Sequence, residues 1–587
     1  MLRVTTANMV RPNFLIIVAD DLGFTDVGCF GGEIHTPNLD QLGYNGLRLT
    51  QFYAAAACSP TRSMLLTGTD NHIAGLGSMF EFIRRNAEFF HDRPGYEGHL
   101  NDKVAALPEL LSDGGYQTFM SGKWHLGLVP EHSPHARGFN KSYTMLSGAS
   151  NHYGWNAEIT GESTILSGTP IHMEDGNYVS DLGENFYSSD AYSAKLIQYL
   201  DTRDREKPFF AYLPFTAPHW PLQAPREIIE KYKDRYNDGP EFLRQSRLRR
   251  QKELGLIDND VVPHPVIAPD ATNWDVLTAD QKKKSARAME VYAAMVERLD
   301  WNVGRVIETL KKNGDFEDTV ILFMSDNGAE GASIEANPRF SKIYEKFGDF
   351  YDNSLDNIGN YDSFVWYGPR WAQAATAPSR LYKMFSSEGG IHVPLLLHYG
   401  GLDTKHKGSI SNVFTTVMDI TPTLLDLGGV PDHEGSFRGK RVAKIRGKSW
   451  KHYLADAAVQ SVYGDEEPVG WELFGQAAIR KGMWKIVFIQ KPLGPEKWQL
   501  YNLSKDPGET TDVSGQYPEK FSELLDDWKR YKLETGSLGT GPEQKEVPPP
   551  EDLLDDETRW MKYERHDPQV ILRELGLENK SLPKLSV

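Results

Sequence analysis

The sequence predicts an α/β fold, with a central sheet flanked by helices and a smaller C-terminal α+β domain that carries a short antiparallel sheet. Three short apolar runs, at 13–19, 209–215 and 319–324, have the composition of buried strands. Long segments with helical periodicity lie between these runs, which is the alternation that α/β folds show. After about residue 449 the pattern changes to short strands separated by turns.

Each of the three predicted strands ends in polar side chains. Asp20 and Asp21 follow the first strand, Pro218 and His219 follow the second, and Ser325–Gly328 follows the third. Open α/β sheets bind ligands at the carboxyl ends of their strands. The sequence therefore predicts one site lined by these three strand ends.

The clearest helix is expected between Thr278 and Asn313. Thr278 and Gln281 form a capping-box pattern, and Asn313-Gly314 is a suitable end. Apolar residues keep a helical period along it, at Met295, Leu299, Val303, Val306 and Leu310. Residues 220–275 and 328–380 are expected to be irregular insertions of the kind that cover active sites.

The domain boundaries follow from this pattern. Residues 1–449 are expected to form the catalytic α/β domain. Residues 450–540 are expected to form the α+β domain, with strands at 477–480, 484–489 and 498–501 and a helix at 521–531. Residues 541–587 are expected to be an acidic helical tail that opens with a proline-rich linker.

The composition limits the kinds of molecule that the protein is expected to bind and the compartment in which it is expected to work. The 587 residues carry a net charge of −17, which opposes non-specific binding to nucleic acid or to an anionic membrane. Two cysteines cannot form a disulfide framework in a chain of this length. No signal-peptide pattern and no membrane-span pattern are seen, so a cytoplasmic location is expected.

Asp20, Asp21, Asp326 and Asn327 are candidate metal ligands. Adjacent carboxylates repel one another unless a cation lies between them. Oxygen ligands suit calcium or magnesium rather than zinc. Taken alone, the Asp20-Asp21 pair is more often a solvated turn or a helix N-cap.

The segment from Cys58 to Gly68, CSPTRSMLLTG, is the most specific motif. Pro60 suits the first turn of a helix, so Cys58 is expected beside free backbone N–H groups that attract anions. Arg62, about one turn later, can reach the same place with its guanidinium group. A lone cysteine without such a context is usually an inert core residue.

This segment resembles the signature of the sulfatases of the alkaline-phosphatase superfamily, and the likeness extends over about 11–531. It is closest to the broad-specificity arylsulfatases of microbes and fungi. The segments that carry it, besides the Cys58 motif, are 11–23, 122–127, 217–219, 325–328, 377–383, 389–394 and 419–425. Thr61 and His392 differ from the residues that are usual there. The resemblance implies a large mixed central sheet of the alkaline-phosphatase type.

The resemblance also implies a mechanism. A maturation enzyme converts Cys58 to formylglycine, which lies beside one Ca²⁺ held with Asp20, Asp21, Asp326 and Asn327. A hydroxyl of the hydrated formylglycine attacks the sulfur of a sulfate ester, and hydrolysis proceeds through a formylglycine-sulfate intermediate. The roles of the other residues are implied as follows: Arg62 and Lys123 hold the formylglycine and the sulfate, His219 and Lys383 stabilise or protonate the leaving oxygen, and His125 takes a proton so that sulfate is released.

Singly, Lys123, His125, His219 and Lys383 would be taken for ordinary polar residues; only their motifs make them candidates. His72, His99 and His152 are weaker candidates for the pocket. Two other functions remain open. One is a phosphonate monoester or phosphodiester hydrolase of the same superfamily, and the other is an inactive calcium-binding relative.

Overall fold

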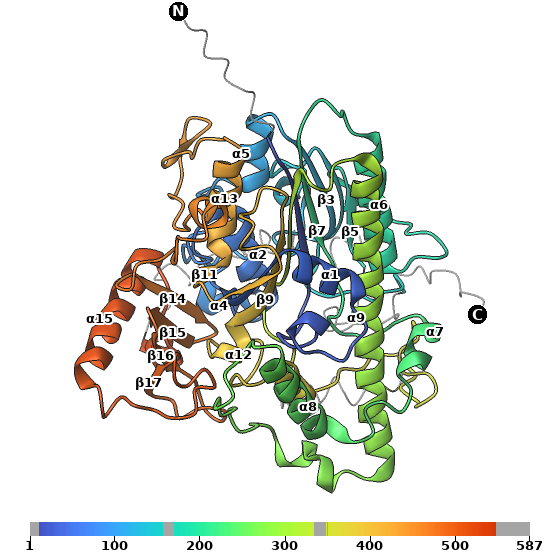
Figure 1. The fold of residues 1–587 in the computed structure, drawn as a ribbon, viewed down its shortest axis with the longest axis vertical. Coiled ribbons are helices and arrows are strands. Elements are labelled where there is room, and N and C mark those ends of the chain that lie inside the picture. The colour runs from blue at the N-terminus through green and yellow to red at the C-terminus, as the bar shows by residue number, and fades with distance from the viewer. Residues whose placement is uncertain (1–10, 156–169, 334–347, 349, 547–587) are drawn as a thin grey trace, which may run out of the picture.

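The computed structural model describes residues 11–155, 170–333, 348 and 350–546, and its core is an 11-stranded mixed sheet (Figure 1). The strand order is β10-β2-β9-β8-β1-β7-β3-β4-β5-β6, and β11 pairs with β2. The strands are β1 (Asn13–Ala19), β2 (Leu47–Tyr53), β3 (Gln117–Lys123), β4 (Lys141–Met145), β5 (His172–Glu174), β6 (Asn177–Val179), β7 (Phe209–Pro214), β8 (Thr319–Ser325), β9 (His392–His398), β10 (Ser409–Ser411) and β11 (Thr415–Thr416).

The three strands expected from the sequence lie side by side at the centre of this sheet. β1 pairs in parallel with β7 on one side and with β8 on the other. β3 continues the parallel arrangement beyond β7, whereas β9 runs antiparallel to β8. The predicted mixed α/β sheet is confirmed, and the carboxyl ends of β1, β3, β7 and β8 meet at one edge.

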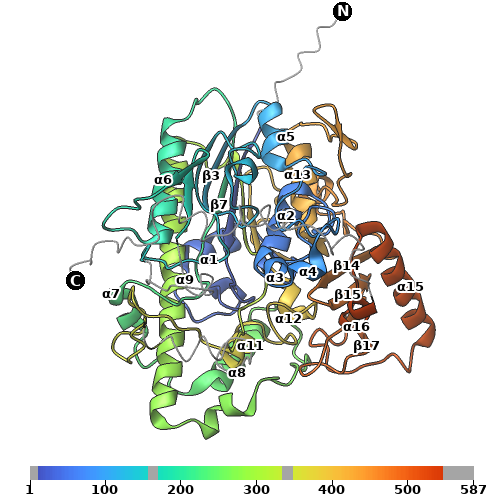
Figure 2. The same ribbon diagram turned by 180° about the vertical axis from the view of Figure 1, so that it is seen from behind.

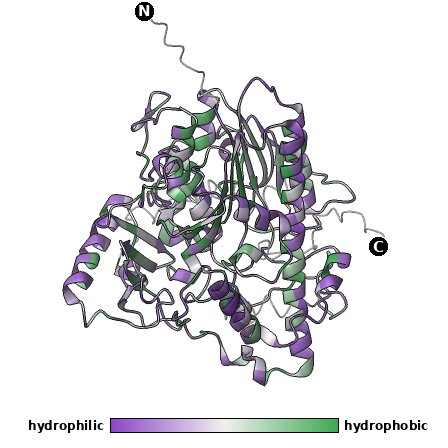
Figure 3. Ribbon diagram, in the orientation of Figure 1, coloured by the Kyte–Doolittle hydropathy of each residue, from purple (hydrophilic) through white to green (hydrophobic). Residues whose placement is uncertain are grey.

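Helices cover both faces of the sheet. In Figures 1 and 2, α6 and α9 lie on one side, and α2, α5 and α13 lie on the other. The helices are α1 (Pro37–Asn45), α2 (Cys58–Thr67), α3 (Phe80–Arg85), α4 (Ala87–Phe90), α5 (Leu107–Asp113), α6 (Ser188–Thr202), α7 (Arg226–Ile229), α8 (Gly239–Glu253), α9 (Ala279–Asn313), α11 (Pro369–Ala375), α12 (Glu388–Ile391), α13 (Ile420–Leu427), α14 (Lys451–Ala455), α15 (Pro518–Thr535) and α16 (Gly541–Glu546). Figure 3 shows apolar central strands between helices in which hydrophilic and hydrophobic residues alternate.

Helix α9 has both of the ends that the sequence predicts. The Thr278 hydroxyl accepts from the Gln281 amide, the Gln281 side chain accepts from the Thr278 amide, and Gly314 closes the helix at φ 77°. Among the described residues, no helix is both long enough and apolar enough to cross a bilayer.

The expectation of irregular loops over 220–275 was wrong for α8, a 15-residue helix. α8 is strongly polar, but it buries Arg247, which pairs with Asp26 at 2.5 Å and with Glu33 at 2.8 Å. Hydrophobic periodicity cannot detect a helix that is held by buried ion pairs. The described part of 328–380 contains α11 and no strand, as expected; residues 334–347 and 349 lie outside the description.

The C-terminal region forms a four-stranded antiparallel sheet covered by α15. Its strands are β14 (Pro468–Leu473), β15 (Gln476–Lys481), β16 (Trp484–Phe488) and β17 (Trp498–Asn502). The short sheet and its helix are confirmed, although β14 was not foreseen. Trp471 of β14 donates to the Ala54 carbonyl at 3.0 Å, so the two sheets are in contact. The division at 449 stays a prediction, and the tail from 547 lies outside the described residues.

Candidate active site

The ten candidate residues all lie at or near the carboxyl edge of the central sheet. Each is buried, with no more than 6% of its surface exposed. Asp20 and Asp21 follow β1, Lys123 ends β3 and His125 comes two residues later, His219 follows β7, and Asp326 and Asn327 follow β8. Cys58 and Arg62 come from α2, and Lys383 precedes α12.

Cys58 is the first residue of α2, and all ten residues of this helix are buried. The residue before it, Ala57, is extended, and Gly68 ends the helix in the left-handed conformation at φ 65°. The Cys58 thiol donates to Asp21 Oδ1 across 4.0 Å. Burial raises the pKa of this thiol well above its ordinary value, even though Lys123 and Lys383 oppose the shift. An unmodified Cys58 is therefore a neutral thiol and a poor nucleophile.

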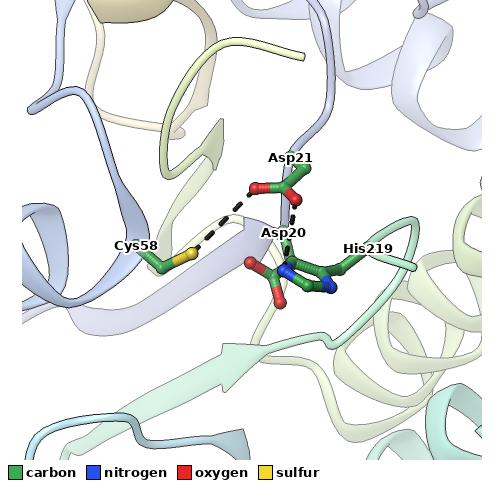
Figure 4. A group of neighbouring side chains, drawn as sticks. All are labelled: Asp20, Asp21, Cys58 and His219. Carbon is green, nitrogen blue, oxygen red and sulfur yellow. Dashed lines mark hydrogen bonds and ion pairs between the residues drawn. The ribbon is translucent and has the colours of Figure 1, made fainter. Parts of the chain in front are cut away.

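The carboxylates form a compact cluster around Cys58. Asp20, Asp21, Cys58 and His219 each offer a ligand atom, and these atoms all lie within 4.8 Å of one another (Figure 4). Asp21 adopts a left-handed backbone at φ 72°, and its amide donates to Asp326 Oδ1 at 3.2 Å. Burial and, second, the neighbouring Asp20 raise the pKa of Asp326 to about 6.

Fixed cations surround this cluster. Lys123 Nζ donates to both oxygens of Asp20, at 2.7 and 2.9 Å. Arg62 donates to Asp326 Oδ2 at 2.7 and 3.1 Å, and also to the Lys123 carbonyl at 2.8 Å. Lys383 Nζ lies 2.9 Å from Asp21. These cations offset the carboxylates and also provide positive charge for an anionic substrate.

Asn327 supplies the observation that favours a metal ion. Its side-chain amide donates to Asp21 Oδ1 at 2.7 Å and to the Gly328 carbonyl at 2.9 Å. Its Oδ1 is buried and has no hydrogen-bond partner in the part of the chain that the structure describes. A buried oxygen without a donor is costly unless a cation takes the place of the donor. The oxygen-rich donor set of Asp20, Asp21, Asp326 and Asn327 fits calcium.

His219 faces the cluster from the loop after β7. Its Nε2 lies 3.4 Å from Asp21 Oδ2, and its Nδ1 lies 2.6 Å from the Trp220 carbonyl. Burial lowers the pKa of His219 well below its usual value, so the ring is neutral. Because a carbonyl only accepts, Nδ1 carries the proton of the neutral ring.

Of the three weaker histidine candidates, His152 lies next to the site. Its Nε2 is 2.9 Å from the His219 carbonyl, and burial lowers its pKa to about 4. His72 instead lies between Asp70 and Glu472, at 2.8 Å from each. His99 stacks on His132 with ring centroids 3.7 Å apart. The contacts of His72 and His99 are those of histidines that stabilise the fold.

Two acidic residues beside the site were missed by the sequence reasoning. Glu330 lies 3.0 Å from Lys383 Nζ, and Glu81 lies 3.2 Å from His125 Nε2. Glu330 follows Asp326 by four positions, so its closeness to a strand end was a usable signal. Glu81 is far from every motif in the sequence, and no local pattern points to it.

A buried oxygen cluster, fixed cations and a cysteine at a helix N-terminus thus lie together at one edge of a mixed sheet, as the resemblance implied. Residues 12–430 match the family model described as Sulfatase. An uncharacterized sulfatase of Schizosaccharomyces pombe is 51% identical over 532 residues, covering 90% of this chain and 95% of that protein. An arylsulfatase of Klebsiella aerogenes is 39% identical over 447 residues, covering 76% and 92%.

Solved structures agree on the fold. The crystal structure of Ps i-CgsB superposes with a TM-score of 0.62 at 24% identity, covering 96% of this chain and 99% of that one. The chain belongs to the sulfatase family. Its general activity is therefore the hydrolysis of sulfuric esters.

Proposed function

We propose that this protein hydrolyses sulfate monoesters, aryl and alkyl, to a phenol or alcohol plus inorganic sulfate. In this proposal Cys58 acts as formylglycine after conversion by a maturation enzyme, beside one Ca²⁺. The observation that carries it is the position of Cys58 at the start of α2, within the buried cluster of Asp20, Asp21 and His219. The arylsulfatase relative supports aryl esters as substrates.

Asp20, Asp21, Asp326, Asn327 and the modified Cys58 would hold the calcium ion. When bound, calcium supplies Lewis-acid stabilisation of the sulfate oxygens and lowers the pKa of a neighbouring hydroxyl. The hydrate of formylglycine supplies two hydroxyls on one carbon, one to attack sulfur and one to allow sulfate to be released.

The protein's own cations then have separate tasks. Arg62 fixes the Asp326 carboxylate and the Lys123 carbonyl, which aligns α2 with two strand ends. Lys123 and Arg62 offset negative charge on the sulfate in the transition state. Lys383 has its pKa raised by Asp21 against the opposing effect of burial, so it stays charged and can donate to the leaving oxygen.

His219 and Lys383 are not equivalent as donors. His219 keeps its Nδ1 proton on the Trp220 carbonyl, so its Nε2 can only accept a hydrogen bond while the ring is neutral. Lys383 is then the proton donor to the leaving oxygen. His219 Nε2, at 3.4 Å from Asp21, lies where it can orient groups beside the metal ligands.

The decisive test is turnover of a chromogenic aryl sulfate with calcium, beside the matching phosphonate and phosphodiester, for wild type and Cys58→Ala. We expect sulfate to be the best substrate and Cys58→Ala to lose turnover by several orders of magnitude. Cys29→Ala is the matched control, since Cys29 is also buried but lies outside the cluster. Faster turnover of the phosphonate or phosphodiester would favour a phosphonate monoester or phosphodiester hydrolase. Full activity of Cys58→Ala would contradict the proposed role of Cys58.

A further inference from the structure

Glu81 and His125 form a carboxylate–histidine pair beside the site. Glu81 belongs to the short helix α3, and both of its oxygens lie 3.2 Å from His125 Nε2. Burial alone would raise the pKa of Glu81, but His125 and Lys123 bring it down to about 2. Glu81 is therefore charged near neutral pH. A charged carboxylate only accepts hydrogen bonds, so His125 Nε2 carries a proton.

The other ring nitrogen of His125 is available. Its Nδ1 is buried and has no hydrogen-bond partner among the residues that the structure describes. In the neutral form of the ring, the form that can act as a base, Glu81 keeps the proton on Nε2 and Nδ1 keeps a lone pair. The pair thus selects the tautomer in which Nδ1 can accept a proton.

The backbone around His125 fixes the position of its ring, and Gly148 leaves the space that the Glu81–His125 pair occupies. His125 has a left-handed backbone at φ 57°, and the preceding Trp124 is anchored by its amide to the Met145 carbonyl at 2.8 Å. A Cβ atom on Gly148 would lie 2.7 Å from His125 Nε2 and 2.8 Å from Glu81 Oε1. Only a glycine at position 148 leaves the pair undisturbed.

We propose that Glu81 is a positioning residue for the sulfatase reaction, holding the His125 ring so that Nδ1 is the base of the sulfate-release step. This inference rests on the proposed function of the site. In that step His125 Nδ1 accepts the proton of the free hydroxyl, and the O–H electron pair forms the aldehyde C=O bond. The C–O bond to sulfate breaks, and its electrons leave on the sulfate.

The role makes a specific kinetic prediction, because release follows the step that liberates the phenol. With an activated aryl sulfate, Glu81→Ala is expected to lower kcat by about 10- to 100-fold, part of the effect of a general base. The value of kcat/KM, which reports events up to phenol release, should change less than threefold. A burst of about one phenol per active site should precede the slow steady state. Glu81→Gln keeps an acceptor oxygen and should lose less than Glu81→Ala.

Gly148→Ala is an independent perturbation of the same pair, and it should reproduce the selective loss of kcat. Glu88→Gln is the matched control, because Glu88 is an exposed acid on the adjacent helix α4. Melting temperatures would check that every variant folds. Equal losses in kcat and kcat/KM without a burst, or wild-type kinetics in Glu81→Ala and Gly148→Ala, would overturn the positioning role. An inactive wild type whose Cys58 is converted would instead overturn the proposed function, and the positioning role with it.

Discussion

Asn327 has one buried atom without a hydrogen-bond partner in the described chain, and this atom is part of the proposed metal site. Its buried Oδ1 has no donor within the described chain, while its amide nitrogen is held by Asp21 and Gly328. We expect Asn327→Ala to raise the calcium concentration for half-maximal activity by about 10- to 100-fold, the usual scale for losing one supporting contact at a metal site. Calcium titration of chelator-treated enzyme measures this.

Excess calcium should restore most of the Asn327→Ala activity. Asn327→Asp is the informative companion, because it keeps an oxygen ligand and adds charge. It should bind calcium at least as well as Asn327→Ala. A loss of activity in both variants that calcium cannot restore would argue that Asn327 acts on substrate instead.

Of the individual site residues, those that lie inside short sequence motifs could be predicted from the sequence. Asp20-Asp21, Cys58–Arg62 and Asp326-Asn327 are each contiguous, and each follows a strand or begins a helix. Glu81 meets His125 across 44 positions, so its role depends on how α3 packs and not on any local pattern. The tautomer of His219 depends likewise on the position of one carbonyl.

At the scale of secondary-structure elements, His72 connects the segment after α2 to the C-terminal sheet. Its ring lies between Asp70 and Glu472, and Tyr531 of α15 donates to Asp70 at 2.7 Å. Burial disfavours the charged ring, but Asp70 and Glu472 raise the pKa of His72 to about 9. The protonated His72 therefore stabilises the contact between the two regions.

The sign of the pH effect follows from this shift. A histidine whose folded pKa is raised contributes its full stability below about pH 6.5 and loses it as pH rises toward about 9. The contribution is on the order of 3 kcal/mol. We expect the difference in unfolding free energy between wild type and His72→Gln to shrink over this window, as measured by denaturation at pH 6 to 9.5. A difference that stays constant would contradict a charged His72.

Elements that obey hydrophobic periodicity were predictable, and the others were not. α9 has a regular apolar face and two strong end signals, so its bounds could be read directly. α8 is stabilised by buried Arg247 with Asp26 and Glu33, and only the fold brings these three residues together. β14 contains Pro468 and Gly470, which argue against a strand when considered alone.

For the molecule as a whole, a buried ion network joins the C-terminal sheet to the catalytic sheet. Lys485 of β16 lies 2.7 Å from Glu388 and 2.8 Å from Glu509, and all three side chains are almost fully inaccessible. Glu388 opens α12, directly before β9, and also accepts from Tyr53 of β2 at 2.7 Å. One lysine therefore pairs with two carboxylates at the boundary between the two regions.

Replacing Lys485 should lower the stability of the contact between the two sheets. Lys485→Met leaves Glu388 and Glu509 buried together without the ammonium group that bonds both of them, at a cost of about 3–5 kcal/mol. We expect a lower melting temperature and faster proteolysis near the C-terminal sheet. Lys497→Met is the control, since the Lys497 side chain is 66% exposed, and it should melt like wild type. Equal stability of the two variants would show that the network contributes little.

All ten residues of α2 are buried, and Cys58 has 1% of its surface exposed. An enzyme that must reach the Cys58 side chain can therefore act only while the chain is still unfolded. Under the proposed conversion of Cys58 to formylglycine, the share of molecules that carry the nucleophile would depend on two competing rates, conversion and folding. Stability and activity become separable: a variant whose folding and unfolding rates rise by the same factor would be just as stable, yet fewer of its molecules would be converted before they fold.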